Sequence, residues 1–114
     1  MDRGIVVNLE GALNQVECGA IEGLGHALYS ELTCEDGAPN ASNFDNYRLI
    51  RTNEAPLDIE THFVQSQIHP TGLGEPGLPP VIGAYANALY KATGQRYYNQ
   101  PFLMREEQVE NLGA

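Results

Sequence analysis

The sequence predicts an α+β fold in which two amphipathic helices pack on a small mixed or antiparallel sheet, in one domain. Three observations support this prediction. Two stretches repeat apolar residues at three- and four-residue spacing, several short runs are rich in β-branched and aromatic residues, and strands and helices do not alternate regularly. A chain of 114 residues with 42% hydrophobic residues suits one domain with a modest core.

The first helix is predicted over residues 13–32, where apolar residues fall on one face. Gly19, Gly23 and Gly25 lie inside it, and a glycine in a helix costs about 1 kcal/mol relative to alanine. Such glycines allow close approach of a second backbone or of a ligand. Packing against another backbone is the favoured interpretation, and ligand approach stays open.

The second helix is predicted to begin at Pro79–Pro80, because proline is tolerated in the first helical turn. It carries Tyr85 inward and ends near Lys91, with Gly94 just beyond as a typical C-terminal cap. Both ends are therefore marked by residues that suit a helix boundary.

Short strands are predicted from composition and alternation. They are expected at residues 4–8, 46–51 and 57–65, the last with apolar side chains at every second position, and residues 95–104 are a candidate for a fourth. Asp36–Gly37 predicts a tight turn, and residues 66–78 a Gly/Pro-rich loop. Residues 101–114 are assigned to a polar tail of a domain that spans 1–114.

Charge and composition exclude several function classes. The net charge is −9, and the six basic residues are scattered, which disfavours nucleic acid and an anionic membrane surface. No apolar run is long enough for a membrane span, and the first residues do not resemble a signal peptide, so the cytoplasm is the expected location. Cys18 and Cys34 would lie about 24 Å apart along the predicted helix, so we expect both to be reduced packing residues.

The candidate chemistry is concentrated in one loop. The serines lack a nucleophile-elbow context, and the histidines lack metal-ligand spacing, so the sequence predicts no side-chain metal site. Glu75 is a lone carboxylate in "GLGEPG"; Pro76 favours extended backbone before it, and Gly72 and Gly74 remove side-chain bulk. Such a loop could press against a flat ligand and present one carboxylate. An ordinary surface loop is the competing interpretation.

Two motifs in this order carry a resemblance. The stretches "DRGIVVN…QVECGAIEGLGHALYSEL" and "GLGEPGLPPVIGAYANALYKATG" resemble the C-terminal cofactor-binding domain of molybdenum hydroxylases, the xanthine oxidase and aldehyde oxidoreductase family. With "NFDNYRLIRTNEAP" between them and "GEPGLPP" in the loop, the chain most resembles the beta subunit of isoquinoline 1-oxidoreductase. The resemblance covers about Asp2 to Phe102. It differs from common family members at Cys18, Glu22 and Leu9.

The resemblance implies a function and a set of site residues. It implies an oxidoreductase that hydroxylates an aldehyde or an N-heterocycle with oxygen from water, with Glu75 as the general base. Gln15 matches a cofactor-contacting glutamine, and Gly74 lies in the loop beside the cofactor. Molybdenum in this family is held by a pyranopterin rather than by protein side chains.

The resemblance also implies partners. The remainder of the molybdenum subunit would share the cofactor, and iron–sulfur clusters would lie only in a partner chain. We therefore expect the isolated chain to be inactive. The whole enzyme is expected in the cytoplasm, with the periplasm as the alternative. A second interpretation is a non-catalytic acidic module or remnant that binds a partner or forms a homo-oligomer through exposed apolar surface.

Overall fold

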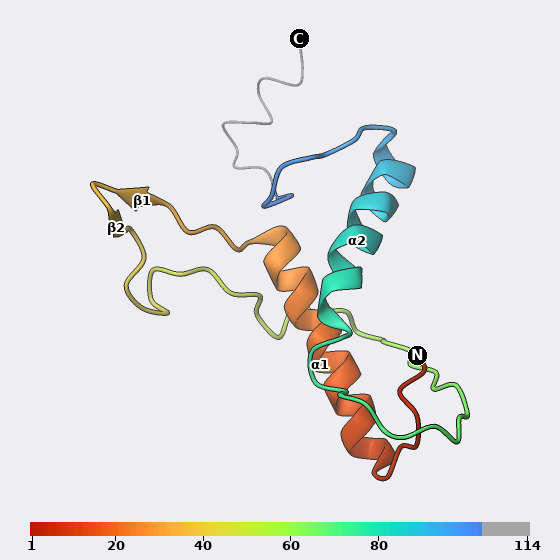
Figure 1. The fold of residues 1–114 in the computed structure, drawn as a ribbon. Helices are drawn as coiled ribbons and strands as arrows, with labels where there is room; N and C mark the ends of the chain where they lie inside the picture. The colour runs from red at the N-terminus through yellow and green to blue at the C-terminus, as the bar shows by residue number, and fades with distance from the viewer. Residues whose placement is uncertain (104–114) are drawn as a thin grey trace.

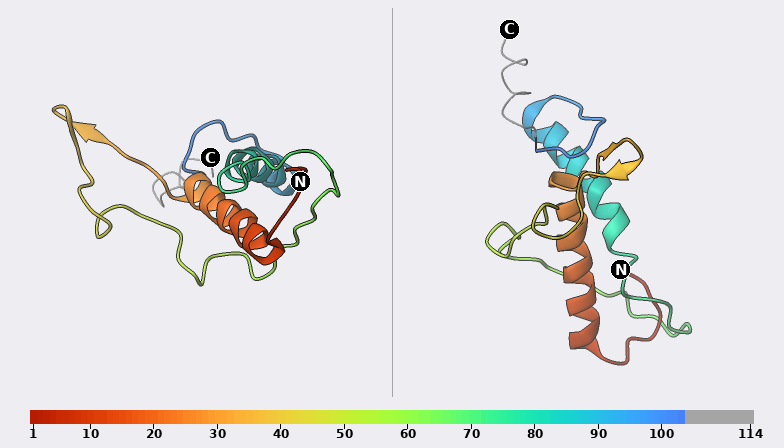
Figure 2. Two further views of the ribbon diagram at one scale, coloured as in Figure 1. Left: turned by 60° about the horizontal axis from the view of Figure 1, so that its bottom comes forward. Right: turned by 90° about the vertical axis from the view of Figure 1, so that its left-hand side faces the viewer.

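The computed structural model describes residues 1–103, and two helices dominate it (Figure 1). Helix α1 spans Leu9–Leu28 and helix α2 spans Leu78–Thr93. They pack side by side and cross, as the views in Figure 2 show. A short hairpin, β1 (Cys34–Glu35) and β2 (Ala38–Pro39), lies between them in the sequence.

Helix α1 begins and ends four residues earlier than the sequence predicts. Asn8 caps its N-terminus, with the side-chain oxygen accepting a hydrogen bond from the Gly11 N–H at 3.0 Å. At the other end the Tyr29 N–H donates to the Gly25 carbonyl at 2.9 Å, and the backbone then leaves the helical conformation. The apolar periodicity identified the helix, but the cap decided its start.

Helix α2 agrees with its prediction at both ends. Pro79 and Pro80 stand in the first turn, where the missing proline N–H breaks no helical hydrogen bond. Gly94 closes the helix in the left-handed conformation, at φ 76°, and its N–H donates to the Tyr90 carbonyl at 2.7 Å.

The glycines of α1 make the contact between the helices. A Cβ at Gly23 would lie 2.7 Å from the Leu78 carbonyl oxygen and 3.1 Å from the Val81 Cβ. A Cβ at Gly19 would meet the Leu78 nitrogen at 3.6 Å. Both glycines are buried, so the interpretation that they allow close packing of a second backbone is confirmed. Gly25 instead faces Ile50, whose Cγ2 would lie 2.9 Å from an added Cβ.

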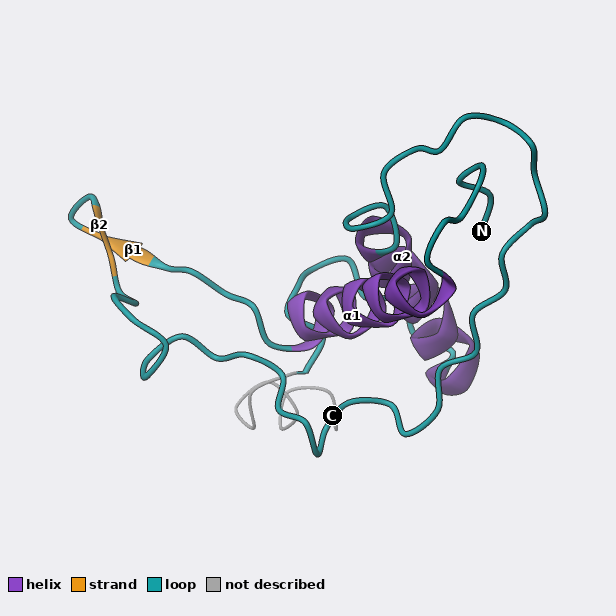
Figure 3. Ribbon diagram, turned by 90° about the horizontal axis from the view of Figure 1, so that it is seen from below, coloured by secondary structure: helices purple, strands orange, loops and turns teal. Residues whose placement is uncertain are grey.

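The fold class is confirmed as two helices with a small antiparallel sheet in one domain, but the sheet lies where the tight turn was predicted. The register pairs Cys34 with Pro39 and Glu35 with Ala38. Asp36 and Gly37 form the turn with positive φ, at 50° and 81°. The helices pack on each other rather than on this sheet, which extends away from them (Figure 3).

The four individual strand predictions are wrong within the described residues 1–103; Met104, at the end of the last one, lies outside them. Segments 4–8 and 57–65 each bond to a residue outside the other: the Ile5 N–H donates to the Ile68 carbonyl at 3.1 Å, and the Val64 N–H to the Met1 carbonyl at 2.8 Å. These hydrogen bonds do not form a continuous ladder. A run with strand composition becomes a strand only when a neighbour pairs along its length.

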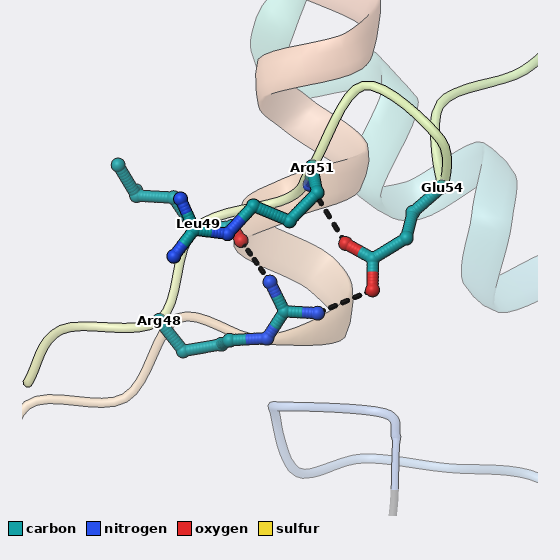
Figure 4. Close-up of polar contacts among 4 residues, drawn as sticks. All are labelled: Arg48, Leu49, Arg51 and Glu54. Atoms are coloured by element: carbon teal, nitrogen blue, oxygen red, sulfur yellow. Dashed lines mark hydrogen bonds and ion pairs between the residues drawn. The ribbon is translucent and has the colours of Figure 1, made fainter. Parts of the chain in front are cut away.

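Segment 46–51 instead closes a loop against the end of α1. The Arg48 guanidinium lies over the Tyr29 ring, 4.2 Å from its centre, and pairs with the Glu54 carboxylate. The other carboxylate oxygen of Glu54 accepts the Arg51 N–H at 2.7 Å (Figure 4). Together with the contact of Ile50 on Gly25, these contacts return the chain to the helices after the hairpin.

Segment 95–103 also returns to the helices. The Phe102 N–H donates to the Ala27 carbonyl at 2.8 Å, near the end of α1, where helical carbonyls lack partners. Its ring stacks on Tyr85 of α2, with ring centres 6.0 Å apart. Phe102 is 9% exposed and joins Ala12 and Ala27 as the buried apolar residues of the described chain.

The chain buries little apolar surface of its own. The buried apolar residues just named include one large side chain, whereas Val7 is 91% and Phe44 72% exposed. The radius of gyration of 17.4 Å exceeds the roughly 13 Å expected of a compact chain of about this length. Much of the apolar surface is therefore open to a further polypeptide.

Candidate cofactor-binding site

The loop that carries Glu75 lies against the middle of α1. A Cβ at Gly77 would lie 3.7 Å from the Val16 carbonyl oxygen, and one at Gly19 would lie 3.7 Å from the Gly74 carbonyl oxygen. The Leu78 N–H donates to the Glu75 carbonyl at 3.0 Å, which joins the loop to the start of α2. The glycines let the loop backbone approach the helix backbone closely.

This packing places Gln15 against Gly74, the residue directly before Glu75 in the chain. A Cβ at Gly74 would lie 3.5 Å from the Gln15 Oε1, so the Gln15 amide lies against the loop directly before Glu75. Gln15 and Glu75 are both exposed. Neither side chain has a hydrogen bond or ion pair within residues 1–103. Both are therefore available to a ligand.

A groove of about 390 Å³ runs beside Gln15. It lies between the segment that leads into α1, the first turns of α1 and the loop before Glu75, and its lining is mostly apolar, with three polar side chains. The lining residues are Ile5, Val6, Val7, Asn8, Gly11, Ala12, Gln15, Pro70, Thr71 and Leu73. Glu75 is not among the lining residues but follows Leu73, which is, by two positions on the same loop. Sequence patterns did not indicate the segments 5–8 and 70–71 as site residues, because only the fold brings them beside Gln15.

The residues fit a cofactor that brings its own metal ligands. Within residues 1–103, no three His, Cys, Asp or Glu side chains lie close enough to hold a metal ion. What the site does offer is an unpaired amide with donor and acceptor atoms, and a loop without side-chain bulk at Gly74. These features suit a flat, polar heterocycle such as a pterin.

The other candidate groups lie elsewhere. His26 contacts Ser30 through Nδ1 at 2.9 Å, and the His62 Nε2 lies 2.8 Å from a Glu60 carboxylate oxygen. Cys18 and Cys34 are free thiols, as predicted, but both are exposed, so the expectation that they are packing residues is wrong.

Two pKa shifts mark the loop closure at the end of α1 rather than the groove. Hydrogen bonds from the Arg51 N–H and from Arg48 hold the pKa of Glu54 below its ordinary value. Burial and the nearby Glu54 charge raise the pKa of Tyr29. We assign Tyr29, Arg48 and Glu54 a structural role rather than a catalytic one; Figure 4 shows the contacts of Arg48 and Glu54.

Comparison with known proteins decides the family. Residues 1–56 match the family described as "Molybdopterin cofactor-binding domain". The chain corresponds to a segment of the molybdopterin cofactor-binding domain of a molybdenum hydroxylase large subunit. The resemblance found in the sequence is confirmed at this level.

Individual relatives support the assignment. The chain is 37% identical to "Membrane-bound aldehyde dehydrogenase [pyrroloquinoline-quinone]" of Gluconacetobacter polyoxogenes, over 89% of this chain and 13% of that one. It is 29% identical to "Isoquinoline 1-oxidoreductase subunit beta" of Brevundimonas diminuta, over 99% of this chain and 14% of that one. The crystal structure of the Cu,Mo-CO dehydrogenase in its carbon monoxide reduced state shares the fold, with a TM-score of 0.69 at 23% identity, over 82% of this chain and 12% of that one.

The chain thus spans about one seventh of the length of these relatives. Among residues 1–103, neither helix is long and apolar enough to cross a membrane.

Proposed function

We propose that this chain forms one wall of a molybdenum-cofactor site in an oxidoreductase that hydroxylates an aldehyde or an N-heterocycle. The observation that carries the proposal is the contact between the Glu75 loop and α1. It places the Gln15 amide 3.5 Å from the Cβ position of Gly74, beside an open groove, with Glu75 next in the chain. The family match supports the cofactor, and the names of the relatives support the substrate classes.

In this proposal each residue has one role. The Gln15 amide would donate to and accept from the pterin, and Gly74 would leave room for it beside the loop backbone. The bound cofactor supplies the oxygen transfer and takes up the electrons. The Glu75 carboxylate accepts the proton released when water-derived oxygen is transferred, which is the work of a general base. Pro76 restricts the backbone of Glu75, so the loop that carries the carboxylate has fewer conformations.

The rest of the site comes from elsewhere. A groove lined by one short chain leaves most of a pyranopterin uncovered, and relatives are about seven times longer. The remainder of the molybdenum subunit would cover the cofactor, and an iron–sulfur chain would receive the electrons. Resemblance to the isoquinoline subunit favours a heterocycle, whereas the higher identity to an aldehyde dehydrogenase favours an aldehyde. We place the assembly in the cytoplasm, with the periplasm as the alternative.

The test is metal content together with turnover. The chain is purified from its native cells with its partners attached, and molybdenum per chain is measured by elemental mass spectrometry, with pyrroloquinoline quinone assayed in parallel. We expect stoichiometric molybdenum. Pyrroloquinoline quinone without molybdenum would refute the proposal and would assign to this protein the cofactor that the name of one relative gives.

Variants assign the roles. Glu75→Gln should keep the molybdenum and lose about 10²- to 10⁴-fold in kcat, because a general base contributes that much. Glu35→Gln, on the exposed hairpin, is the matched control and should change neither. Gln15→Ala should lower cofactor retention up to about tenfold, since one hydrogen bond between neutral groups is worth about 0.5–1.5 kcal/mol, whereas replacement of its exposed neighbour in Asn14→Ala should not. Full activity of Glu75→Gln would refute the assignment.

A second candidate function rests on the exposed apolar surface. Val7, Phe44 and Leu57 are mostly exposed, as in a chain that binds a protein partner or forms homo-oligomers. A non-catalytic module of this kind would fold and associate unchanged after replacement of both Gln15 and Glu75 by alanine, and it would carry no molybdenum.

A further inference from the structure

Residues 58–67 form an extended segment that lacks a neighbouring strand along most of its length. The segment has no turn or bend, and side chains alternate between half-buried, at Ile59, Thr61 and Phe63, and exposed. This alternation is typical of a strand with one face on the body of a protein. Within the described part of the chain, backbone hydrogen bonds of residues 58–64 reach only Met1.

The contact with Met1 shows which edge of the segment accepts a neighbour. The Met1 nitrogen donates to the His62 carbonyl at 2.6 Å, and the Val64 N–H donates to the Met1 carbonyl at 2.8 Å. This is the hydrogen-bond pattern of a parallel pair. Figure 1 shows the N-terminus beside this segment. N–H and C=O groups of alternate residues share one edge of a strand, so Asp58 and Glu60 present theirs on the edge that Met1 occupies.

The charged side chains on the exposed face of this segment indicate which kind of partner strand it would bind. The exposed face carries Asp58, Glu60 and His62, and the Glu60 and His62 side chains are both 78% exposed. A second copy of this chain is disfavoured, because an antiparallel pair centred on Glu60 sets two carboxylates opposite each other, and each chain has a net charge of −9. A strand with Lys or Arg on this face meets the carboxylates of Asp58 and Glu60 instead, although one Glu60 oxygen already lies 2.8 Å from the His62 Nε2.

We infer that residues 58–62 are a docking edge for an extended, basic segment of the remainder of the molybdenum subunit, which adds a strand in line with Met1. The source of that strand rests on the proposed function; the edge itself does not. The added strand would bond to the N–H and C=O groups of Asp58 and Glu60, and its lysines or arginines would lie beside their carboxylates.

A peptide tests the edge directly on the full chain. The probe is acetyl-Lys-Val-Lys-Ile-Lys-Val-Lys-amide, and hydrogen exchange of single amides is followed by NMR. We expect amide exchange at Asp58 and Glu60 to slow by about tenfold or more, while Ile59 and Thr61, on the opposite edge, change little. A peptide with N-methyl groups at its apolar positions cannot donate there and should give no protection, and a glutamate-for-lysine peptide should give less.

Proline variants provide the matched pair. Glu60→Pro removes an N–H from the docking edge and should abolish peptide binding, whereas Thr61→Pro removes one from the other edge and should keep it. Glu60→Gln should keep the protection with weaker, less salt-dependent binding.

Several results would overturn the inference: no protection by the lysine peptide, equal protection by the N-methylated one, or protection at Ile59 and Thr61. Protection that rises with protein concentration without peptide would assign the edge to a second copy instead. Peptide binding requires no cofactor. If the peptide binds while molybdenum is absent from the native assembly, the docking edge is supported and the proposed function is refuted. If molybdenum is present but the peptide does not bind, only the docking edge is refuted.

Discussion

Replacing Gly23 by alanine should separate the two helices and destabilise the chain. The new Cβ would lie 2.7 Å from the Leu78 carbonyl oxygen and 3.1 Å from the Val81 Cβ. Ordinary contact begins at 3.4 Å, and the first of these neighbours is backbone, which cannot rotate away. Helix α2 must therefore move away from α1 by several tenths of an ångström.

Two opposing effects set the change in the free energy of unfolding caused by Gly23→Ala. Overpacking of a well-packed contact costs about 1–3 kcal/mol. Alanine in place of glycine inside a helix returns about 1 kcal/mol. We expect a net loss of about 1 kcal/mol in the free energy of unfolding, together with a weaker Tyr85–Phe102 stack, because that stack depends on the position of α2.

Gly83 provides the matched control, since it lies in α2 and an added Cβ would meet no atom within 4 Å. Gly83→Ala should gain about 0.5–1 kcal/mol from helix propensity alone. Urea unfolding followed by far-UV circular dichroism measures both variants. A Gly23→Ala chain as stable as Gly83→Ala would show that the glycine contact does not hold the helices together.

Two further changes test the segments that return to the helices. Hydrogen bonds from the Arg51 N–H and from Arg48 lower the pKa of Glu54 in the folded chain. Ionised Glu54 therefore stabilises the fold at pH values above its pKa in the unfolded chain, and this stabilisation is lost as the pH falls through its pKa in the folded chain. Glu54→Gln should therefore flatten the acid side of the stability profile below about pH 4.5 and leave the neutral side less stable, as measured by urea unfolding at a series of pH values. Phe102→Ala should cost about 3 kcal/mol, because it removes a buried ring stacked on Tyr85, whereas the same change at the 72%-exposed Phe44 should cost little. Equal effects of the two alanine substitutions would contradict the placement of Phe102.

The sequence by itself determined the two helices and three candidate residues of the site. Apolar periodicity, Pro79–Pro80 and Gly94 are local signals, and local signals suffice for a helix because its hydrogen bonds lie within the segment. The tight turn at Asp36–Gly37 was found for the same reason. Glu75, Gln15 and Gly74 were found through motifs, and their functional roles remain predictions.

Only the tertiary structure decided the strands and the surroundings of the site. A strand needs a partner from elsewhere, so strand-like composition at residues 57–65 could not reveal that pairing would stop at Met1. The glycine residues of α1 left packing and ligand approach open until Leu78 and Val81 were placed against them. The groove beside Gln15 joins segments distant in sequence, and no periodicity records which loops meet there. Contacts between remote segments depend on how the whole chain packs, and that information is not local.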